Sequence, residues 1–228
     1  MSLVIALAVS RVAVIGADRR AIAFFGPCPE LEEELYSGKI ENDTVLVARA
    51  KELGVSLQIS DGREKVWRRG DLLVGEVTEI SAKLSRRRRI YIAPGASLQV
   101  DITTSDSAVA AAVADADANA VRCSCEEACN EEASGEARIR AWGGVGCIVF
   151  GNRFTQKLAY EEVSRAGGRV NEALIRSILE KAGEKTASVS REHTVLQSIA
   201  KRADARAALL QALEEDCKEN GWRLCAPQ

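Results

Sequence analysis

Residues 2–26 read SLVIALAVSRVAVIGADRRAIAFFG, and this stretch decides the fold. It contains two short apolar runs rich in Val and Ile, separated by Ser10 and Arg11. Short apolar runs with a polar break between them predict a hairpin of two buried strands. The charged segment GADRRAIA, residues 16–23, follows the second run directly. The sequence therefore predicts an opening β-hairpin that leads into a charged segment.

Beyond the hairpin, the sequence predicts blocks of strands and blocks of helices. Residues 29–54 read as two helices, because acidic residues open the first, Leu46, Ala50 and Leu53 suit one face of the second, and Gly54 suits its end. Strands are expected at residues 55–60, 65–69, 71–81, 88–94, 97–103, 137–142 and 146–151. Helices are expected at residues 155–167, 170–185 and 197–221, with a late strand in the polar segment that separates the last two. This order favours an α+β fold over regular βαβ alternation.

Length and composition limit the functional classes. The 228 residues suffice for one αβ domain with a full core, or for one domain with a small appendage. A formal net charge of −2 and an aromatic content of 4% argue against nucleic-acid binding. No run approaches the roughly 20 consecutive apolar residues of a membrane helix, and residues 3–9 lack the preceding positive charges of a signal peptide. We expect a cytoplasmic protein without membrane insertion.

The seven cysteines are irregularly spaced, which favours reduced thiols over a disulfide scaffold. Cys123, Cys125 and Cys129 form a C-x-C-x3-C pattern inside an Ala-rich segment, residues 105–135. Such spacing occurs in zinc and iron–sulfur sites, but a tight zinc site normally has four ligands and the pattern supplies three. His193, the sole histidine, is distant in sequence. We expect neither a metal nor a cofactor.

Two further patterns have structural interpretations. Four arginines at residues 86–89 read as a charged turn between strands, although a phosphate or an acidic partner is an alternative. Gly143, Gly144 and Gly146 resemble a phosphate loop only superficially, because the lysine of that motif is missing. A tight turn explains these glycines.

Ser2 is the candidate nucleophile, because a small second residue permits removal of Met1. The resulting α-amino group titrates near ~7.7–8.0 and can act as a base near neutral pH. It can activate the hydroxyl of the same residue, as in N-terminal serine and threonine hydrolases. Since many cytosolic proteins begin Met-Ser, the pattern needs its context.

That context resembles the start of a proteasome β subunit, in which a nucleophilic residue opens a strand pair and an acidic residue and an arginine follow. The offsets from Ser2 to Asp18 and to Arg20 match without a gap. The resemblance implies that Asp18 organises a catalytic lysine, with Arg20 as its structural partner. Lys65, followed by Val66, fits that lysine, whose positive charge would lower the pKa of the hydroxyl. An ordinary ion pair between Asp18 and Lys65 is the alternative.

The chain also departs from the proteasome pattern. Fourteen residues after Lys65, where the family has the glycine whose N–H forms the oxyanion hole, this chain has Glu79. A backbone donor does not require glycine, but a glutamate alters the pocket. Ser188 and Ser190 are the closest candidates for the supporting serine near a late strand.

A closer resemblance is to the connectases, protein ligases of methanogens that are related to proteasome β subunits. The similarity covers residues 2–100 and 145–195. The segments that carry it are SLVIALAV (2–9), GADRRAIAFFG (16–26), ELEEELYSGKI (30–40), ARAKELGVSLQISD (48–61), LVGEVTE (73–79), RRRRIYI (86–92) and IVFGN (148–152).

The resemblance implies the fold and the reaction. The fold would be an N-terminal-nucleophile αββα sandwich over residues 1–195, with a helical insertion at 29–54, an Ala- and Cys-rich insertion at 105–135 and a C-terminal helical segment at 196–228. Ser2 would attack a peptide bond in a short sequence containing Asp-Pro-Gly, form an acyl-enzyme and pass the acyl group to a new amine. The implied natural partner is a methyltransferase subunit of methanogenesis. A simple peptide hydrolase and a non-catalytic interaction protein with the same fold are the alternatives.

Overall fold

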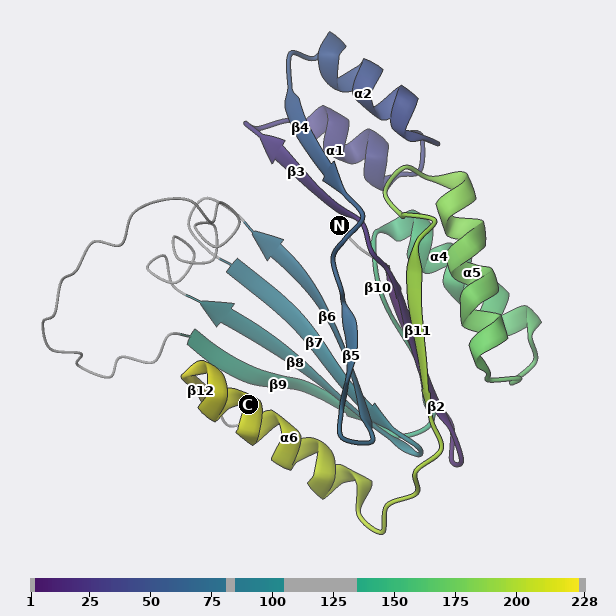
Figure 1. The fold of residues 1–228 in the computed structure, drawn as a ribbon, viewed down its shortest axis with the longest axis vertical. Helices are drawn as coiled ribbons and strands as arrows, with labels where there is room; N and C mark the ends of the chain where they lie inside the picture. Colours follow the sequence, from purple (N-terminus) through teal and green to yellow (C-terminus); the bar gives the residue numbers. More distant parts are fainter. Residues whose placement is uncertain (1–2, 81–84, 105–134, 226–228) are drawn as a thin grey trace, which may run out of the picture.

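The computed structural model describes residues 3–80, 85–104 and 135–225 (Figure 1). Within these ranges the chain forms twelve strands and five helices, so the predicted α+β class is confirmed. Two sheets face each other, and helices cover their outer faces. None of the described helices is both long enough and apolar enough to span a bilayer.

The predicted N-terminal hairpin forms the centre of a four-stranded antiparallel sheet. Its strand order is β10, β1, β2, β11. The strands are β1 (Val4–Ala8), β2 (Ala13–Asp18), β10 (Gly146–Phe150) and β11 (His193–Ser198). Val4 pairs with Ala17 and Ala8 with Ala13, so the polar break at Ser10 forms the turn.

The second sheet has six strands in the order β12, β9, β8, β7, β6, β5. All neighbours in it are antiparallel except β12 and β9, which are parallel. The strands are β5 (Val66–Arg69), β6 (Leu72–Ile80), β7 (Ser85–Ala93), β8 (Ala96–Thr104), β9 (Gly135–Gly143) and β12 (Trp222–Cys225). The tight turn predicted at Gly144 joins β9 to β10.

The alternation of side chains along β1 explains the layers. Successive residues of a strand point to opposite faces, so both faces of an apolar run must be covered. Ile5 and Leu7 pack with the core under α4 (Arg153–Arg165) and α5 (Glu172–Lys185). Val4 and Ala6 instead pack against the six-stranded sheet. The outer face of that sheet is covered by α6 (Ala205–Asn220), giving the order helices, sheet, sheet, helix.

The pair of helices predicted after the hairpin is confirmed. These helices belong to a unit with a small core of its own. It consists of β3 (Ala21–Phe25), α1 (Pro29–Tyr36), α2 (Asp43–Glu52) and β4 (Ser56–Ser60), of which β3 and β4 pair with each other. Its own core contains Leu31, Leu35, Leu46 and Ala50. This unit contains the helices expected at residues 29–54, and from here on the helical insertion means residues 21–60. It lies at one end of the sandwich (Figure 1).

Two sequence predictions are wrong. The arginines at 86–89 do not form a turn but lie within β7, where Arg89 pairs with Glu76 and Arg86 with Asp101. The helix expected from residue 197 begins only at Ala205, because β11 runs through Ser198 and the Asp204 side chain caps the helix.

Candidate active site

Two buried side chains of opposite charge meet where β2 ends and β5 begins. Lys65 Nζ lies 2.8 Å from Asp18 Oδ2. The Asp18 side chain is fully buried and that of Lys65 is 2% exposed. Asp18 is the last residue of β2, and Lys65 directly precedes β5 in the facing sheet. Removing such charges from water costs several kcal/mol per ion unless they are paired and hydrogen-bonded.

Backbone groups complete the environment of this pair. Asp18 Oδ1 accepts a hydrogen bond from the Leu3 N–H at 2.7 Å, and Oδ2 accepts one from the Arg20 N–H at 2.8 Å. Lys65 Nζ also donates to the Arg20 carbonyl oxygen at 2.7 Å. Burial lowers the pKa of Lys65, and the charge and hydrogen bond of Asp18 oppose this effect. Lys65 therefore releases its proton more readily than an exposed lysine does.

Arg20 contacts the pair through its backbone, while its guanidinium points to the helical insertion. Nε lies 2.8 Å from Asp61 Oδ1, Nη2 lies 3.0 Å from Asp43 Oδ2, and Nη1 donates to the Ala187 carbonyl at 2.7 Å. The hydrogen bonds to Asp61 and Asp43 raise the pKa of Arg20 despite its burial. Residue 20 thus joins the buried pair to the insertion.

Ser188 and Ser190 lie in the segment that joins α5 to β11, and both are buried. Ser190 Oγ accepts a hydrogen bond from the Arg19 N–H at 3.0 Å and donates to the Glu192 carbonyl at 2.6 Å. Ser188 Oγ accepts one from Asn152 Nδ2 at 3.1 Å. Ser190 therefore holds the charged segment after β2, whereas Ser188 holds the start of α4.

Ser2 and the side chain of Glu79 lie outside the described residues. The backbone of Glu79 lies in β6, opposite Arg86 of β7. Leu3, the residue that follows Ser2 in sequence, is fully buried and donates its N–H to Asp18. The first described residue is therefore hydrogen-bonded directly to the carboxylate of the buried pair.

The family described as connectase MJ0548-like, N-terminal domain, matches residues 1–116 and 127–218 of this chain. The chain belongs to this family. The connectase resemblance stated from the sequence segments is therefore confirmed. No curated protein sequence matches the chain. Membership in the connectase family favours a ligase-like role.

In this connectase-family chain, the sequence did not predict a cavity between the helical insertion and α4. A cavity of about 670 Å³ opens between α1 and the start of α4. Its lining includes Glu33, Tyr36, Arg88, Asn152, Arg153 and Lys157. Gly151 also lines it, and a Cβ on Gly151 would stand 3.3 Å from Leu3 Cδ1, so this lining residue lies near the first described residue. Asn152 caps α4 by accepting from the Thr155 N–H, and such a cap predicts a helix start rather than a cavity.

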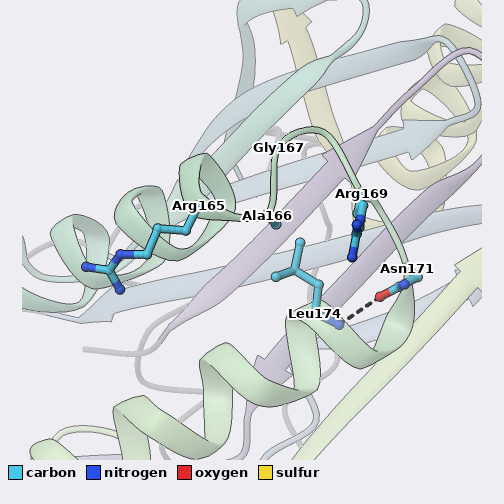
Figure 2. Close-up of a pocket in the computed structure, with 6 residues that line it drawn as sticks. All are labelled: Arg165, Ala166, Gly167, Arg169, Asn171 and Leu174. Atoms are coloured by element: carbon cyan, nitrogen blue, oxygen red, sulfur yellow. Dashed lines mark hydrogen bonds between the residues drawn. The ribbon is translucent and has the colours of Figure 1, made fainter.

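A second cavity, of about 500 Å³, lies at the connection of α4 and α5 (Figure 2). Arg165 points away from it and pairs with Glu162. The Asn171 side chain is engaged in capping α5, where it accepts from the Leu174 N–H at 2.8 Å. The Asn171 amide therefore serves a helix end, and we assign this cavity no chemistry.

Cysteine and acidic side chains form no metal site in the described part of the chain. Within residues 3–80, 85–104 and 135–225, no group of three or more His, Cys, Asp or Glu side chains could hold a metal ion. Cys28, Cys147, Cys217 and Cys225 are free thiols. Cys123, Cys125 and Cys129 lie outside these ranges, so our expectation for them stays a prediction.

Proposed function

We propose that this chain is an N-terminal-serine peptide ligase with the sandwich fold of N-terminal-nucleophile hydrolases. The observation that carries the proposal is the hydrogen bond between Asp18 and the Leu3 N–H. This bond ties the residue after Ser2 to the buried Lys65 pair. Family membership and the order of layers, helices, sheet, sheet, helix, support the same conclusion.

The proposed acylation requires that Met1 has been removed. The Ser2 hydroxyl proton passes to the α-amino nitrogen of the same residue, and Oγ bonds to the carbonyl carbon of a substrate peptide bond. The C–N bond of that peptide then breaks. The departing amine takes up the proton from the α-ammonium group, and an ester remains on Ser2.

The proposed ligation step uses a second peptide. Its amine attacks the ester carbonyl, the bond to Ser2 Oγ breaks, and the proton lost by the amine returns to Oγ. The result is a new peptide bond and a regenerated serine. Water would compete with the amine at this step and would give hydrolysis instead.

Lys65 has an electrostatic role in this proposal. A cation beside Ser2 Oγ stabilises the negative charge that develops when the hydroxyl loses its proton. Asp18 opposes the lowering of the Lys65 pKa by burial, and it also fixes the direction of Nζ. Asp18 and Lys65 thus form one unit, in which the carboxylate preserves the charge that the reaction needs.

The proposed substrate is a protein or peptide that contains an Asp-Pro-Gly sequence, as the family resemblance implies. A methyltransferase subunit of methanogenesis is the proposed natural partner. The cavity lined by Arg88 and Asn152 also contains Gly151, which lies near Leu3, and it is the proposed path by which the peptide approaches Ser2. The alternative is a non-catalytic interaction protein that keeps the fold.

Intact-mass spectrometry tests the proposal. Processed protein is incubated with an Asp-Pro-Gly peptide and a second, labelled peptide. Wild type should form an adduct and transfer the label, whereas Ser2→Ala and Lys65→Ala should do neither. Ser10→Ala, in the exposed turn, and Lys201→Ala, on the exposed segment before α6, are matched controls that should behave as wild type.

The outcomes separate the alternatives. Label transfer by Ser2→Ala at the wild-type rate would refute the mechanism. An adduct that water resolves and the amine does not would indicate a peptide hydrolase. A processed wild type without any adduct would favour the non-catalytic alternative.

A further inference from the structure

Arg20 belongs to two parts of the molecule at once. Its main chain holds the buried pair, because its N–H donates to Asp18 and its carbonyl accepts from Lys65. Its side chain, which is 8% exposed, extends to the helical insertion and its flank. A shift of the Arg20 side chain would therefore displace groups that contact both members of the pair.

Two aspartates fix the guanidinium of Arg20. Asp61 follows β4 and accepts from Nε and Nη2 at 2.8 and 2.9 Å, in the bidentate geometry that suits a guanidinium. Asp43 is the first residue of α2 and accepts from Nη1 and Nη2. The two carboxylates come from opposite ends of the segment that contains α2 and β4. Its position therefore sets the position of the arginine.

Without these carboxylates, the buried guanidinium of Arg20 would lose both of the anions described above. A buried charge that loses its partner is costly and seeks another anion. Asp18 is a fully buried carboxylate two residues away in sequence, and its Oδ2 is the acceptor of Lys65. Competition for Asp18 would weaken the hold on Lys65.

We propose that Asp61 and Asp43 are positioning residues for catalysis, which hold the Arg20 guanidinium against the helical insertion and its flank and thereby reserve Asp18 for Lys65. This inference rests on the proposed function for its catalytic meaning. It gives the helical insertion a role in the reaction without any contact with the reacting atoms. The geometry of the insertion then determines whether Lys65 is charged and oriented.

The charges around Lys65 give the direction of the expected effect. Asp18 from β2 and Asp61 from the β4–β5 connection raise the pKa of Lys65, whereas burial and Arg63 from the same connection lower it. Neutralising Asp61 removes one raising charge and one of the two anions that hold the Arg20 guanidinium. The pKa of Lys65 should therefore fall, and the basic limb of a pH–rate profile should move to lower pH.

The test compares Asp61→Asn and Asp43→Asn with Asp71→Asn. Asp71 is a matched control, because it pairs with Arg202 away from the site and is 35% exposed, against 34% for Asp61. The pKa of Lys65 is measured by NMR on lysine labelled with ¹³C at Cε, and the Lys65 signal is assigned by its loss in Lys65→Ala. Asp61→Asn should lower this pKa by about 0.5–1 unit, and Asp71→Asn should leave it unchanged.

The kinetic readout uses the same variants. On the basic limb of the pH–rate profile, Asp61→Asn should reduce kcat for label transfer about three- to tenfold with little change in KM, and Asp61→Glu should restore part of the loss. A variant that loses stability while the Lys65 pKa and the basic limb stay at wild-type values would overturn the inference. If Asp61→Asn does not fold, Asp43→Asn, whose carboxylate is 51% exposed, decides by the same criterion. If wild type transfers no label, the proposed function fails, while the NMR titration still decides whether the aspartates control Lys65.

Discussion

Removing the carboxylate of Asp216 should destabilise the protein more than any change at a neighbouring surface acid. Asp216 lies on α6 and its side chain is 5% exposed. Its Oδ2 accepts from Arg89 Nη1 at 2.5 Å and from the Tyr91 hydroxyl, and its Oδ1 pairs with Arg69. Tyr91 is fully buried, and burial raises its pKa, so its hydroxyl stays protonated and donates.

The magnitude follows from what Asp216→Ala leaves behind. Arg89, whose side chain is 7% exposed, keeps Glu76 but loses one of its two anions. Hydrogen bonds to charged groups contribute about 1.5–3 kcal/mol each, and two such bonds to buried donors are lost. The expected cost is about 3–5 kcal/mol, the usual penalty for removing one partner of a buried ion pair. This is a large part of a total stability of about 5–15 kcal/mol.

Urea unfolding followed by far-ultraviolet circular dichroism measures the effect. With a slope of about 2–3 kcal/mol/M, the midpoint should fall by about 1–2.5 M. Glu215→Ala is the control, because Glu215 is the preceding residue and also pairs with Arg69, at 3.3 Å, but is 46% exposed. Such exposed pairs contribute about 0–1 kcal/mol. If Asp216→Ala costs no more than Glu215→Ala, the reasoning about buried charge at this helix is wrong.

Three further predictions concern packing, thiol chemistry and acid stability. Gly16→Ala should lower the free energy of unfolding in urea by about 1–3 kcal/mol, because the new Cβ would stand 2.4 Å from a side-chain carbon of α5. Gly146→Ala is the control and should be near neutral, because no atom lies within 4 Å of its Cβ. Equal costs would contradict this. Burial raises the pKa of the Cys147 thiol to about 11, so iodoacetamide should alkylate it slowly at pH 7.5 and much faster as the pH approaches 10, as peptide mass mapping would show. Arg20 lowers the pKa of Asp61 below its ordinary value of 3.8, so the ion pair contributes stability above that pH and loses it as the pH falls through the lower folded-state pKa. The urea midpoint should therefore fall less steeply between pH 6 and pH 2 in Asp61→Asn than in wild type. Identical slopes would exclude this contribution.

The strands of the N-terminal hairpin could be predicted because their signal is local. Its apolar runs are continuous rather than alternating, which indicates burial on both faces, and both faces of β1 are indeed covered. The two helices of the insertion were also readable, since acidic residues open the first, one apolar face marks the second and Gly54 follows its end. In each case the residues that define the element lie within a few positions of one another.

The arginines at 86–89 show why other elements could not be predicted. Consecutive charges normally indicate a solvated turn, but here partners from distant strands and rings compensate them. Arg88 lies over Phe150 with 5.3 Å from its guanidinium carbon to the ring centre, and Arg89 binds Glu76. Phe150 is distant from Arg88 in sequence, and Glu76 faces Arg89 only through the register of β6 and β7. The terminal strand β12 was missed for the same reason, because its partner β9 is distant in sequence.

The site divides in the same way. The offset to Asp18 and the Lys65 and Val66 pair pointed to residues that the fold brings to 2.8 Å of each other. The aspartates that hold Arg20 gave no such signal. In the sequence, Asp43 looks like an ordinary acidic residue in the first turn of a helix. Asp61 looks like an ordinary residue of a polar connection between strands. Their relation to the site exists only after the insertion folds back onto β2.

The stacking of Arg89 on two tryptophans under α6 makes their intrinsic fluorescence sensitive to the position of this helix. The guanidinium carbon of Arg89 lies 5.2 Å from the ring centre of Trp67 and 4.9 Å from that of Trp222. Indole emission responds to nearby charge and to contact with water. Separation of α6 from the sheet would therefore change the fluorescence emission of Trp67 and Trp222. The third tryptophan, Trp142, is 36% exposed and lies on β9. Intrinsic fluorescence of this protein should therefore record the detachment of the C-terminal helix.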